Sequence, residues 1–240
     1  MGHSSLTTVD FFLDGVRQAG RLLAGGDADV VGVTLFSLRV ALTSTVAACA
    51  IGIPVGFVLG TTPFWGRRAA LTVVNTMLAF PTVVVGVLIW GLLTRNGPLG
   101  GLGLLYTWWA IVIAEIVLAV PVAAALSAAA VQAVDPRVRR TALTLGAGPI
   151  RSHLVVARAA RFTLATAVIV AFGRVLAEVG AAMIVGGNIR HHTRTLTTSV
   201  ALAASQGEFA LALALGLVLL GLAVTVNVLL QLAQGRGPGG

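Results

Sequence analysis

The segment AVDPRVRRTALTLGAGPI, residues 133–150, decides the fold because it separates two long apolar stretches of the chain. Asp135 suits the N-cap of a helix, Pro136 its first position, and Gly146 a left-handed end. The three arginines inside the segment need contact with water. We therefore predict a short basic helix, a turn and a second short helical piece between two membrane-crossing helices. The alternative is a plain loop that keeps its arginines in water.

The composition outside this segment is that of an integral membrane protein. Of the 240 residues, 57% are hydrophobic and 10% are charged, whereas a soluble domain carries about 25% charged residues. Sixteen basic and eight acidic side chains cannot cover a water-exposed surface of this size. All the basic residues are arginine, so the lysine of a G-x-x-x-x-G-K-[ST] phosphate loop is missing. The chain itself cannot hold that kind of ATP site.

Long charge-free stretches set the number of membrane crossings, because one crossing needs about 20 apolar residues. Such stretches cover residues 40–66, 69–94, 96–114, 116–134 and 209–235. We predict an all-α polytopic bundle with one transmembrane domain, residues 31–234, followed by a short tail, residues 235–240. The five expected helices lie near 33–60, 70–94, 107–132, 160–185 and 209–233. A polar loop, residues 133–159, joins the third to the fourth.

The first part of the chain, residues 1–30, has a different pattern. Phe11 and Phe12 alternate with Asp10, Asp14 and Arg17, which is typical of an amphipathic helix lying on a membrane surface. The other possibility is a poorly ordered tail.

Arginines in the loops predict how the chain is oriented. Five crossings put the termini on opposite sides of the membrane. Of the sixteen arginines, Arg39 and Arg174 fall within crossings and the rest lie in loops or near the termini. One side carries nine arginines: Arg67, Arg68, Arg137, Arg139, Arg140, Arg151, Arg158, Arg161 and Arg236. The other side carries five: Arg17, Arg21, Arg95, Arg190 and Arg194. We expect a multi-pass protein of the cell membrane with the nine-arginine side in the cytoplasm, the N-terminus outside and the C-terminus inside.

Small residues and prolines mark the packing of the crossings. Gly52, Gly56 and Gly60 repeat every fourth residue, which lets another helix backbone approach closely. Pro54, Pro81 and Pro121 fall inside predicted crossings and are expected to kink or open them. Kinks of this kind either serve helix packing or line a pathway, and Pro81 and Pro121 are candidates for the second role.

Two opposite charges lie inside the fourth predicted crossing. Arg174 and Glu178 are four residues apart and so share one helix face. A charge in mid-membrane costs about 2.5–3.5 kcal/mol on insertion scales, so both side chains should face protein or water. They form either an ion pair that packs the bundle or a charged element beside a translocation path. Glu115 in the third crossing is expected at a helix–helix contact.

Several motifs together resemble a known family. Permease subunits of ATP-binding-cassette importers carry a cytoplasmic E-A-A-x-x-x-G loop, and Ala142 and Gly146 match its third position and its glycine. Arg140 and Thr141 replace the glutamate and the first alanine. The stretches 34–42 and 75–86, and above all FGRVLAEVGAAMIVGGNIR at 172–190 followed by TRTLTT at 193–198, resemble tungstate-importer permeases, relatives of the molybdate and sulfate permeases.

The resemblance implies a type I importer permease fold that moves an oxyanion, most plausibly tungstate, with molybdate or sulfate as alternatives. It also implies a loop that couples to an ATPase, formed by Asp135, Pro136, Arg137, Arg140, Thr141, Ala142, Gly146 and Ala147. Candidates for the path and its outer gate are Pro81, Arg174, Glu178, Asn188, Arg190, Thr193, Arg194, Thr195, Thr197 and Thr198. The alternative interpretation of the outer segment, residues 186–208, is an ordinary polar loop without a role in gating.

The expected partners follow from the same resemblance and from the small number of crossings. Five helices cannot enclose a gated path, so we expect a two-fold homodimer. Two ATPase subunits would hold ATP and Mg²⁺, and an extracytoplasmic binding protein would deliver the anion. Lipid surrounds the assembly, and nucleic acid is not expected. The chain is expected to be a transport subunit and no enzyme, with no catalytic residue or cofactor of its own, because the partner subunit would hydrolyse ATP. No metal site is expected either, because His191 and His192 lack a third ligand.

Two other classes of protein were weighed against the permease. A self-contained carrier or channel often contains internal repeats, but no repeat is visible and five crossings do not divide into equal halves. An intramembrane enzyme would need a motif such as G-x-S-x-G or H-E-x-x-H, or paired intramembrane carboxylates. The sequence contains none of these patterns.

Overall fold

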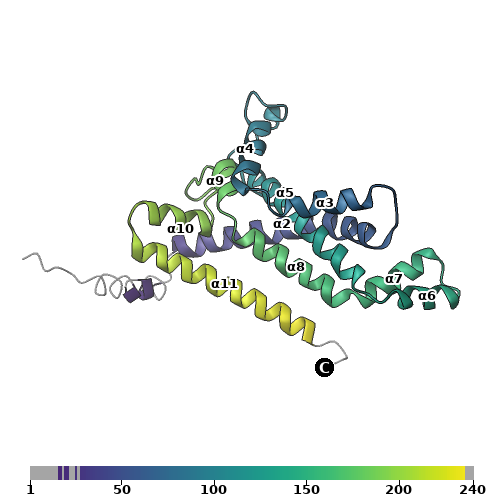
Figure 1. The fold of residues 1–240 in the computed structure, drawn as a ribbon. Helices are drawn as coiled ribbons and strands as arrows, with labels where there is room; N and C mark the ends of the chain where they lie inside the picture. The colour runs from purple at the N-terminus through teal and green to yellow at the C-terminus, as the bar shows by residue number, and fades with distance from the viewer. Residues whose placement is uncertain (1–15, 18, 22–24, 26–27, 236–240) are drawn as a thin grey trace, which may run out of the picture.

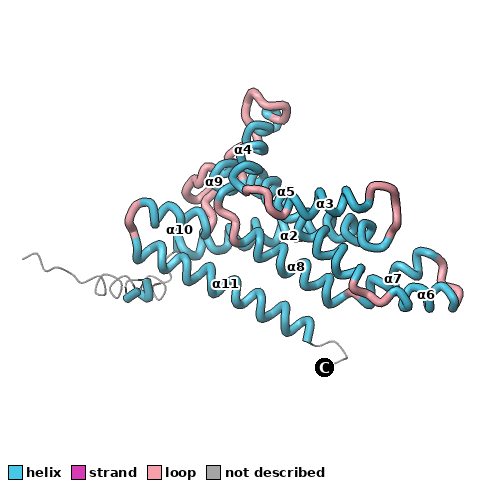
Figure 2. The backbone as a smooth tube through the Cα atoms, in the orientation of Figure 1, coloured by secondary structure: helices cyan, strands magenta, loops and turns pink. Residues whose placement is uncertain are grey.

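The computed structural model describes residues 16–17, 19–21, 25 and 28–235, and all regular structure in these residues is helical (Figures 1 and 2). Most of the interfacial segment expected over residues 1–30 and nearly all of the tail expected over 235–240 lie outside the described residues. The helices are α2 (Ala28–Thr61), α3 (Arg67–Met77), α4 (Thr82–Leu93), η1 (Gly100–Leu102), α5 (Trp108–Gln132), α6 (Pro136–Thr144), α7 (Pro149–Ala159), α8 (Arg161–Leu176), α9 (Gly180–Gly186), α10 (Leu196–Ser205) and α11 (Phe209–Gly235).

The long helices form an elongated bundle. In the described part of the chain, α2, α5 and α11 are each long and apolar enough to cross a membrane, and counting two bent helix pairs as one span each gives up to five spans. Figure 1 shows the α2–α3 loop together with α6 and α7 at one end of this bundle, and α10 at the other. The arginine-rich loops that the sequence assigned to one side therefore lie at the same end.

The α2–α5 contact forms the centre of the bundle. A Cβ atom on Gly52 would lie 2.7 Å from the Ala123 side chain, and one on Gly56 would lie 2.8 Å from Ser127 Cβ. Only glycine permits this approach, so the predicted role of the glycine repeat is confirmed. Proline does not break these two helices, because Pro54 lies inside continuous α2 and Pro121 inside continuous α5.

The helix expected near 70–94 is divided in two. Helices α3 and α4 meet at a bend of 97°. Pro81 is the N-cap of α4, with extended backbone angles (φ −62°, ψ 121°). Proline has no N–H to continue α3 and disfavours helical angles at the residue before it, so the chain must leave the helix here. Helix α4 points away from the long axis of the bundle (Figure 1).

The helix expected near 160–185 is also divided, at residues 177–179. No proline causes this break. In a continuous helix the Ala181 N–H would bond to the backbone carbonyl four residues earlier, but it donates instead to the Glu178 side chain, 3.0 Å away. A carboxylate thus replaces the backbone acceptor at the start of α9, and the helix restarts in a new direction.

Candidate translocation and coupling sites

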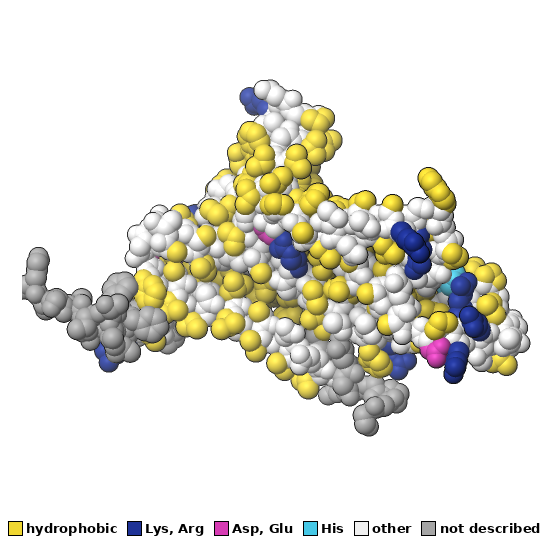
Figure 3. All heavy atoms as spheres, viewed as in Figure 1, with side chains coloured by type: hydrophobic (Ala, Val, Ile, Leu, Met, Phe, Trp, Pro, Cys, Tyr) yellow, Lys and Arg dark blue, Asp and Glu magenta, His cyan; other side chains and the backbone are white. Residues whose placement is uncertain are grey.

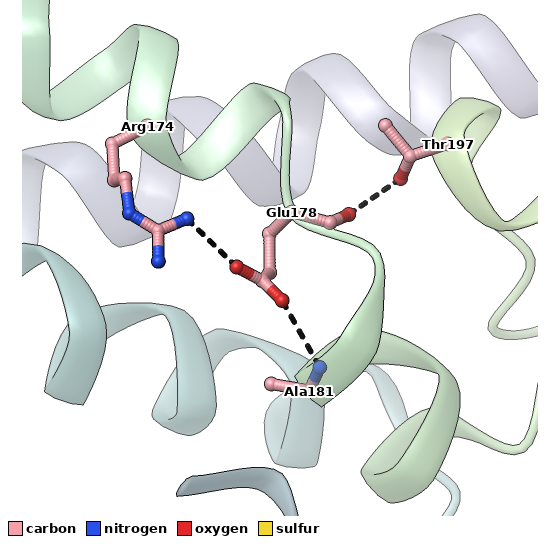
Figure 4. A network of polar contacts seen from close by, with 4 residues as sticks. All are labelled: Arg174, Glu178, Ala181 and Thr197. Atoms are coloured by element: carbon pink, nitrogen blue, oxygen red, sulfur yellow. Dashed lines mark hydrogen bonds and ion pairs between the residues drawn. The ribbon is translucent and has the colours of Figure 1, made fainter. Parts of the chain in front are cut away.

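The break between α8 and α9 holds the two intramembrane charges singled out in the sequence. Arg174 Nη1 lies 2.8 Å from Glu178 Oε2, while Glu178 Oε1 accepts the Ala181 N–H (Figure 4). Thr197 Oγ1 on α10 donates to the Glu178 backbone carbonyl at 2.6 Å. Arg174 is in the last turn of α8 and Glu178 precedes the first turn of α9, so each charge also complements the dipole of the nearby helix end.

The two members of this ion pair differ in exposure. The Glu178 side chain is 2% exposed and the Arg174 side chain 32%. Buried charge is tolerated when it is paired and hydrogen-bonded, and both Glu178 oxygens have partners. The arginine reaches the surface of the chain beside exposed Gly173 and Ala177. The pair therefore presents a cation that is partly neutralised from behind by a carboxylate.

The α3–α4 break lies against the α8–α9 break. A Cβ atom on Gly180, at the start of α9, would lie 2.8 Å from Val83 Cγ2 and 3.0 Å from Thr82 Oγ1, both just after Pro81. Deeper in α4, a Cβ on Gly86 would lie 2.8 Å from the Ala181 Cα. The structure thus brings together the two helix interruptions, with Pro81 exposed on one and the Arg174 side chain at the surface of the other.

A small cavity of about 10 Å³ adjoins Glu178, which is room for one water molecule. Ser37, Glu115, Thr195 and Thr197 contribute to its polar lining. Glu115 on α5 is buried, and it lines this cavity together with Ser37 of α2, so it lies at a helix–helix contact as expected. Its Oε2 has no hydrogen-bond partner among the described residues. The sequence analysis missed Ser37, whose hydroxyl accepts the Leu196 N–H at 2.7 Å.

The four threonine candidates are buried inside the chain. Thr195 and Thr198 form a reciprocal capping box that starts α10. Thr193 Oγ1 donates to the Gly186 carbonyl at 2.5 Å and accepts the Ile189 N–H at 3.0 Å. With Thr197 bonded to Glu178, these hydroxyls hold α10 against α9 and the α8–α9 break. Their part in an outer gate stays a prediction.

The remaining outer candidates are polar groups of the α9–α10 connection. Asn188 adopts a left-handed conformation (φ 49°) and its amide donates to the Thr198 carbonyl at 3.4 Å. Arg194 donates to the Asn188 carbonyl at 3.3–3.4 Å. Arg190 is exposed and forms an ion pair with Asp29 at the start of α2. Asp29 escaped the sequence analysis because the two residues are 161 positions apart and no local pattern links them.

The α6–α7 hairpin agrees closely with the prediction for residues 133–150. Asp135 Oδ1 accepts the Arg137 N–H at 2.8 Å, Pro136 begins α6, and Gly146 has the expected positive φ of 84°. Helix α7 is the second short piece. Of the candidate coupling residues, Ala142 is buried and Ala147 half-buried, whereas the others are exposed: Asp135, Pro136, Arg137, Arg140, Thr141 and Gly146.

Two exposed apolar side chains stand at the turn of this hairpin. Leu145 is 83% exposed and Ile150 is 76% exposed. Arginines dominate this segment of the sequence and drew the prediction to the charged face, but the position of the two residues beside Gly146 and Pro149 is a signal for an apolar tip. Such a tip, surrounded by arginines, is suited to contact with another protein.

The base of the hairpin is packed onto the bundle. Val156 and Ala160 form a buried cluster with Val131 at the end of α5. The ring of His153 on α7 meets Phe57 of α2 edge to face, with 6.0 Å between centroids and 86° between planes. A force applied to the hairpin therefore reaches α2, α5 and α8 directly.

Comparison with known proteins agrees with this architecture. Residues 52–236 match the family described as "Binding-protein-dependent transport system inner membrane component". A probable anion ABC transporter permease protein of Haloferax volcanii is 37% identical over 187 residues, covering 75% of this chain and 81% of the relative. The tungstate uptake system permease protein TupB of Peptoclostridium acidaminophilum is 36% identical over 192 residues, covering 80% and 84%.

A solved structure gives the same result for the fold. A bacterial ABC transporter that imports the acidic polysaccharide alginate contains a chain that superimposes with a TM-score of 0.71 at 16% identity, covering 98% of this chain and 92% of that one. The fold is thus that of a type I importer permease, and the protein is a multi-pass membrane protein. The chain belongs to the family of binding-protein-dependent transport system inner membrane components.

Proposed function

We propose that this chain is the membrane-spanning subunit of an ATP-driven importer that moves tungstate into the cell, with molybdate as the alternative substrate. The observation that carries the proposal is the junction of two broken helices beside the Arg174–Glu178 pair. Interrupted membrane helices leave backbone N–H groups and helix ends available where an ion passes. The curated relatives named for tungstate and anion transport support the substrate class.

The charge at the junction suits transport of a tetrahedral dianion. The path must replace part of the hydration shell of the anion, yet a dense cluster of cations would retain it. Glu178 tempers the charge of Arg174, which is held by one ion pair and remains accessible on one side. The path thus attracts the anion without trapping it.

The exposed apolar face of α4 supports a homodimer. Helix α4 buries one side against α9 and exposes Val83, Val84, Val87, Leu88 and Leu92. A two-fold dimer would place two α8–α9 breaks around one axis, with Arg174 contributed by each protomer. Helix α11, few of whose apolar residues are buried in the described part of the chain, would face lipid.

The α6–α7 hairpin would be the docking point of the ATPase. Its exposed apolar tip, with Arg137 and Arg140, would fit the ATPase surface, and its packed base would pass movement to α2, α5 and α8. ATP and Mg²⁺ belong to that subunit. The hairpin end is then cytoplasmic, with the N-terminus outside and the C-terminus inside, and the outer end around Arg190 and Arg194 would receive an extracytoplasmic binding protein.

Uptake by the reconstituted complex tests this function. The permease, its ATPase and its binding protein are placed in proteoliposomes, and uptake of tungstate, molybdate and sulfate is compared with and without ATP. We expect ATP-dependent uptake of tungstate that competes with molybdate. Uptake of these anions by the permease alone, without ATPase or ATP, would contradict the proposal and favour a carrier or channel.

A further inference from the structure

The elbow between α7 and α8 forms a basic cavity that lies apart from the hairpin tip and from the α8–α9 break. The two helices meet at Ala160 with a bend of 66°. A cavity of about 550 Å³ opens at this bend, within the range of about 300–1,000 Å³ typical of small-molecule sites. Its lining consists of three arginines and three apolar residues: Arg151, Leu154, Val155, Ala157, Arg158 and Arg161.

The positive charge of this cavity is not balanced by nearby acids. Between Asp135 and Glu178 the sequence contains no acidic residue, and Asp135 already caps α6. Among the described residues, Arg151, Arg158 and Arg161 form no ion pair with a carboxylate. All three arginines are exposed. The elbow therefore concentrates positive potential and favours an anionic ligand.

Apolar side chains lie next to these arginines. Leu154 is 61% exposed and Val155 is 39% exposed, both on the cavity wall. Phe162 lies beside the cavity, with the Arg161 guanidinium 4.5 Å from its ring centroid. A soluble anion would gain nothing from this apolar wall. A ligand with an anionic head and a hydrocarbon chain would satisfy both parts of the lining.

The position of the elbow points to the source of such a ligand. Helix α7 carries arginines and belongs to the polar hairpin, whereas α8 runs into the apolar bundle. Figure 3 shows basic side chains, in dark blue, gathered at the hairpin end of the molecule. The bend between the two helices is thus at the level where the hairpin meets the membrane, which is where lipid headgroups lie.

We propose that the α7–α8 elbow binds an anionic phospholipid of the cytoplasmic leaflet, with its phosphate against the three arginines and its acyl chains along Leu154 and Val155. This inference rests on the orientation given under the proposed function, in which the hairpin end of the molecule faces the cytoplasm. The bound lipid would brace the α7–α8 bend and fix the height of the coupling hairpin above the bilayer.

Lipid retention by the intact permease–ATPase complex tests the site without measuring transport. The complex is purified from a mixture of phosphatidylglycerol and phosphatidylcholine, and the retained lipids are counted by native mass spectrometry. Wild type should retain phosphatidylglycerol preferentially. Arg151→Gln/Arg158→Gln/Arg161→Gln should weaken its retention about a hundredfold, since each arginine near an anionic surface contributes about a fivefold effect.

Matched controls separate this site from general charge and from protein docking. Arg68→Gln removes an exposed arginine on the same side but outside the cavity, and should retain phosphatidylglycerol as wild type does. The single variant Arg158→Gln is less disruptive and replaces the triple variant if that one fails to assemble. Its retention of phosphatidylglycerol should be about fivefold weaker than that of wild type. Unchanged lipid retention in the assembled variants would overturn the proposal. So would loss of the ATPase with lipid retention unchanged, because the arginines would then contact protein.

Discussion

The α6–α7 hairpin and the α9–α10 connection use their polar residues in opposite ways. In the hairpin, Arg137 and Arg140 point into solvent and the one acid, Asp135, bonds to a backbone N–H two residues away. In the outer connection, Thr195 and Thr198 are buried and bond to each other. The hairpin is therefore built to present a surface, while the outer connection is built to hold the α8–α9 break in one shape.

This difference predicts two separable sets of variants. Substitutions in the outer network should lower the stability of the permease and leave ATPase docking intact in the molecules that fold. Substitutions at the exposed tip should weaken ATPase docking and leave the stability of the permease unchanged. Comparison of unfolding in detergent with ATPase binding measures both properties on the same protein.

The largest effect on stability is expected from Glu178→Leu. The substitution removes the partner of Arg174 and the acceptor of the Ala181 N–H in a buried position. Because Arg174 is about one-third exposed and can be partly hydrated, we expect a loss of about 2–3 kcal/mol, below the full cost of breaking a buried pair. Denaturant unfolding measures it. Glu178→Gln keeps an acceptor for Ala181 and should lose less; equal stability of the Leu variant and wild type would refute the network.

A smaller loss is expected from Thr198→Val. Valine keeps the shape of threonine but removes the hydroxyl that accepts the Thr195 N–H at 2.9 Å. A buried N–H left without its partner costs about 1–3 kcal/mol. Thr198→Ser keeps the hydroxyl and serves as the matched control. If the Val variant unfolds at the same denaturant concentration as the Ser variant, the capping box is not what stabilises α10.

In the hairpin, Asp135→Ala should lower the local stability of helix α6 by about 1 kcal/mol, because the Asp135 side chain caps α6 by accepting the Arg137 N–H. The loss is local, so we expect a lower ATPase-stimulated transport rate with little change in global unfolding. Asp135→Ser retains a capping oxygen and should restore coupling. A global destabilisation as large as that of Glu178→Leu would remove the distinction between the two regions.

The smallest effect on stability is expected from Leu145→Asp, since this side chain is 83% exposed. Exposed substitutions usually change the free energy of unfolding by less than about 0.5 kcal/mol. ATPase binding, in contrast, should weaken by at least about tenfold, because a charge would enter an apolar contact. Leu102→Asp, an exposed leucine in η1 between α4 and α5, should leave ATPase affinity unchanged. Normal ATPase affinity of the Leu145 variant would argue against docking at the tip.

The contrast between the two regions also explains what the sequence could predict. The hairpin follows from local signals, namely Asp135, Pro136 and Gly146, each acting within a few residues. The existence of α2, α5 and α11 follows from long apolar stretches that carry few charges. The glycine repeat of α2 indicated a close helix contact and the structure supplied α5 as its partner.

The helix breaks and the outer network could not be predicted in the same way. The spacing of Arg174 and Glu178 fits a continuous helix, yet the carboxylate caps the next segment and so ends the one before it. Pro81 opens its helix, as its presence in the predicted crossing indicated, but the sequence does not show that the two halves meet at 97°. The Leu196–Ser37 bond joins residues 159 positions apart, so no local pattern shows it.

The most direct test of the central claim asks whether the surface beside Arg174 lines a water-filled path. Cys49 is the only cysteine of the chain and is buried, so Cys49→Ala provides a background without reactive thiols. Ala177→Cys then places one thiol on the exposed face three residues from Arg174, and Leu220→Cys places one on exposed α11 as a lipid-facing control. In the assembled transporter, we predict that a membrane-impermeant thiol reagent modifies the cysteine at 177 and that tungstate slows the reaction. Modification at 177 no faster than at 220, or with no protection by tungstate, would contradict a path along the α8–α9 break.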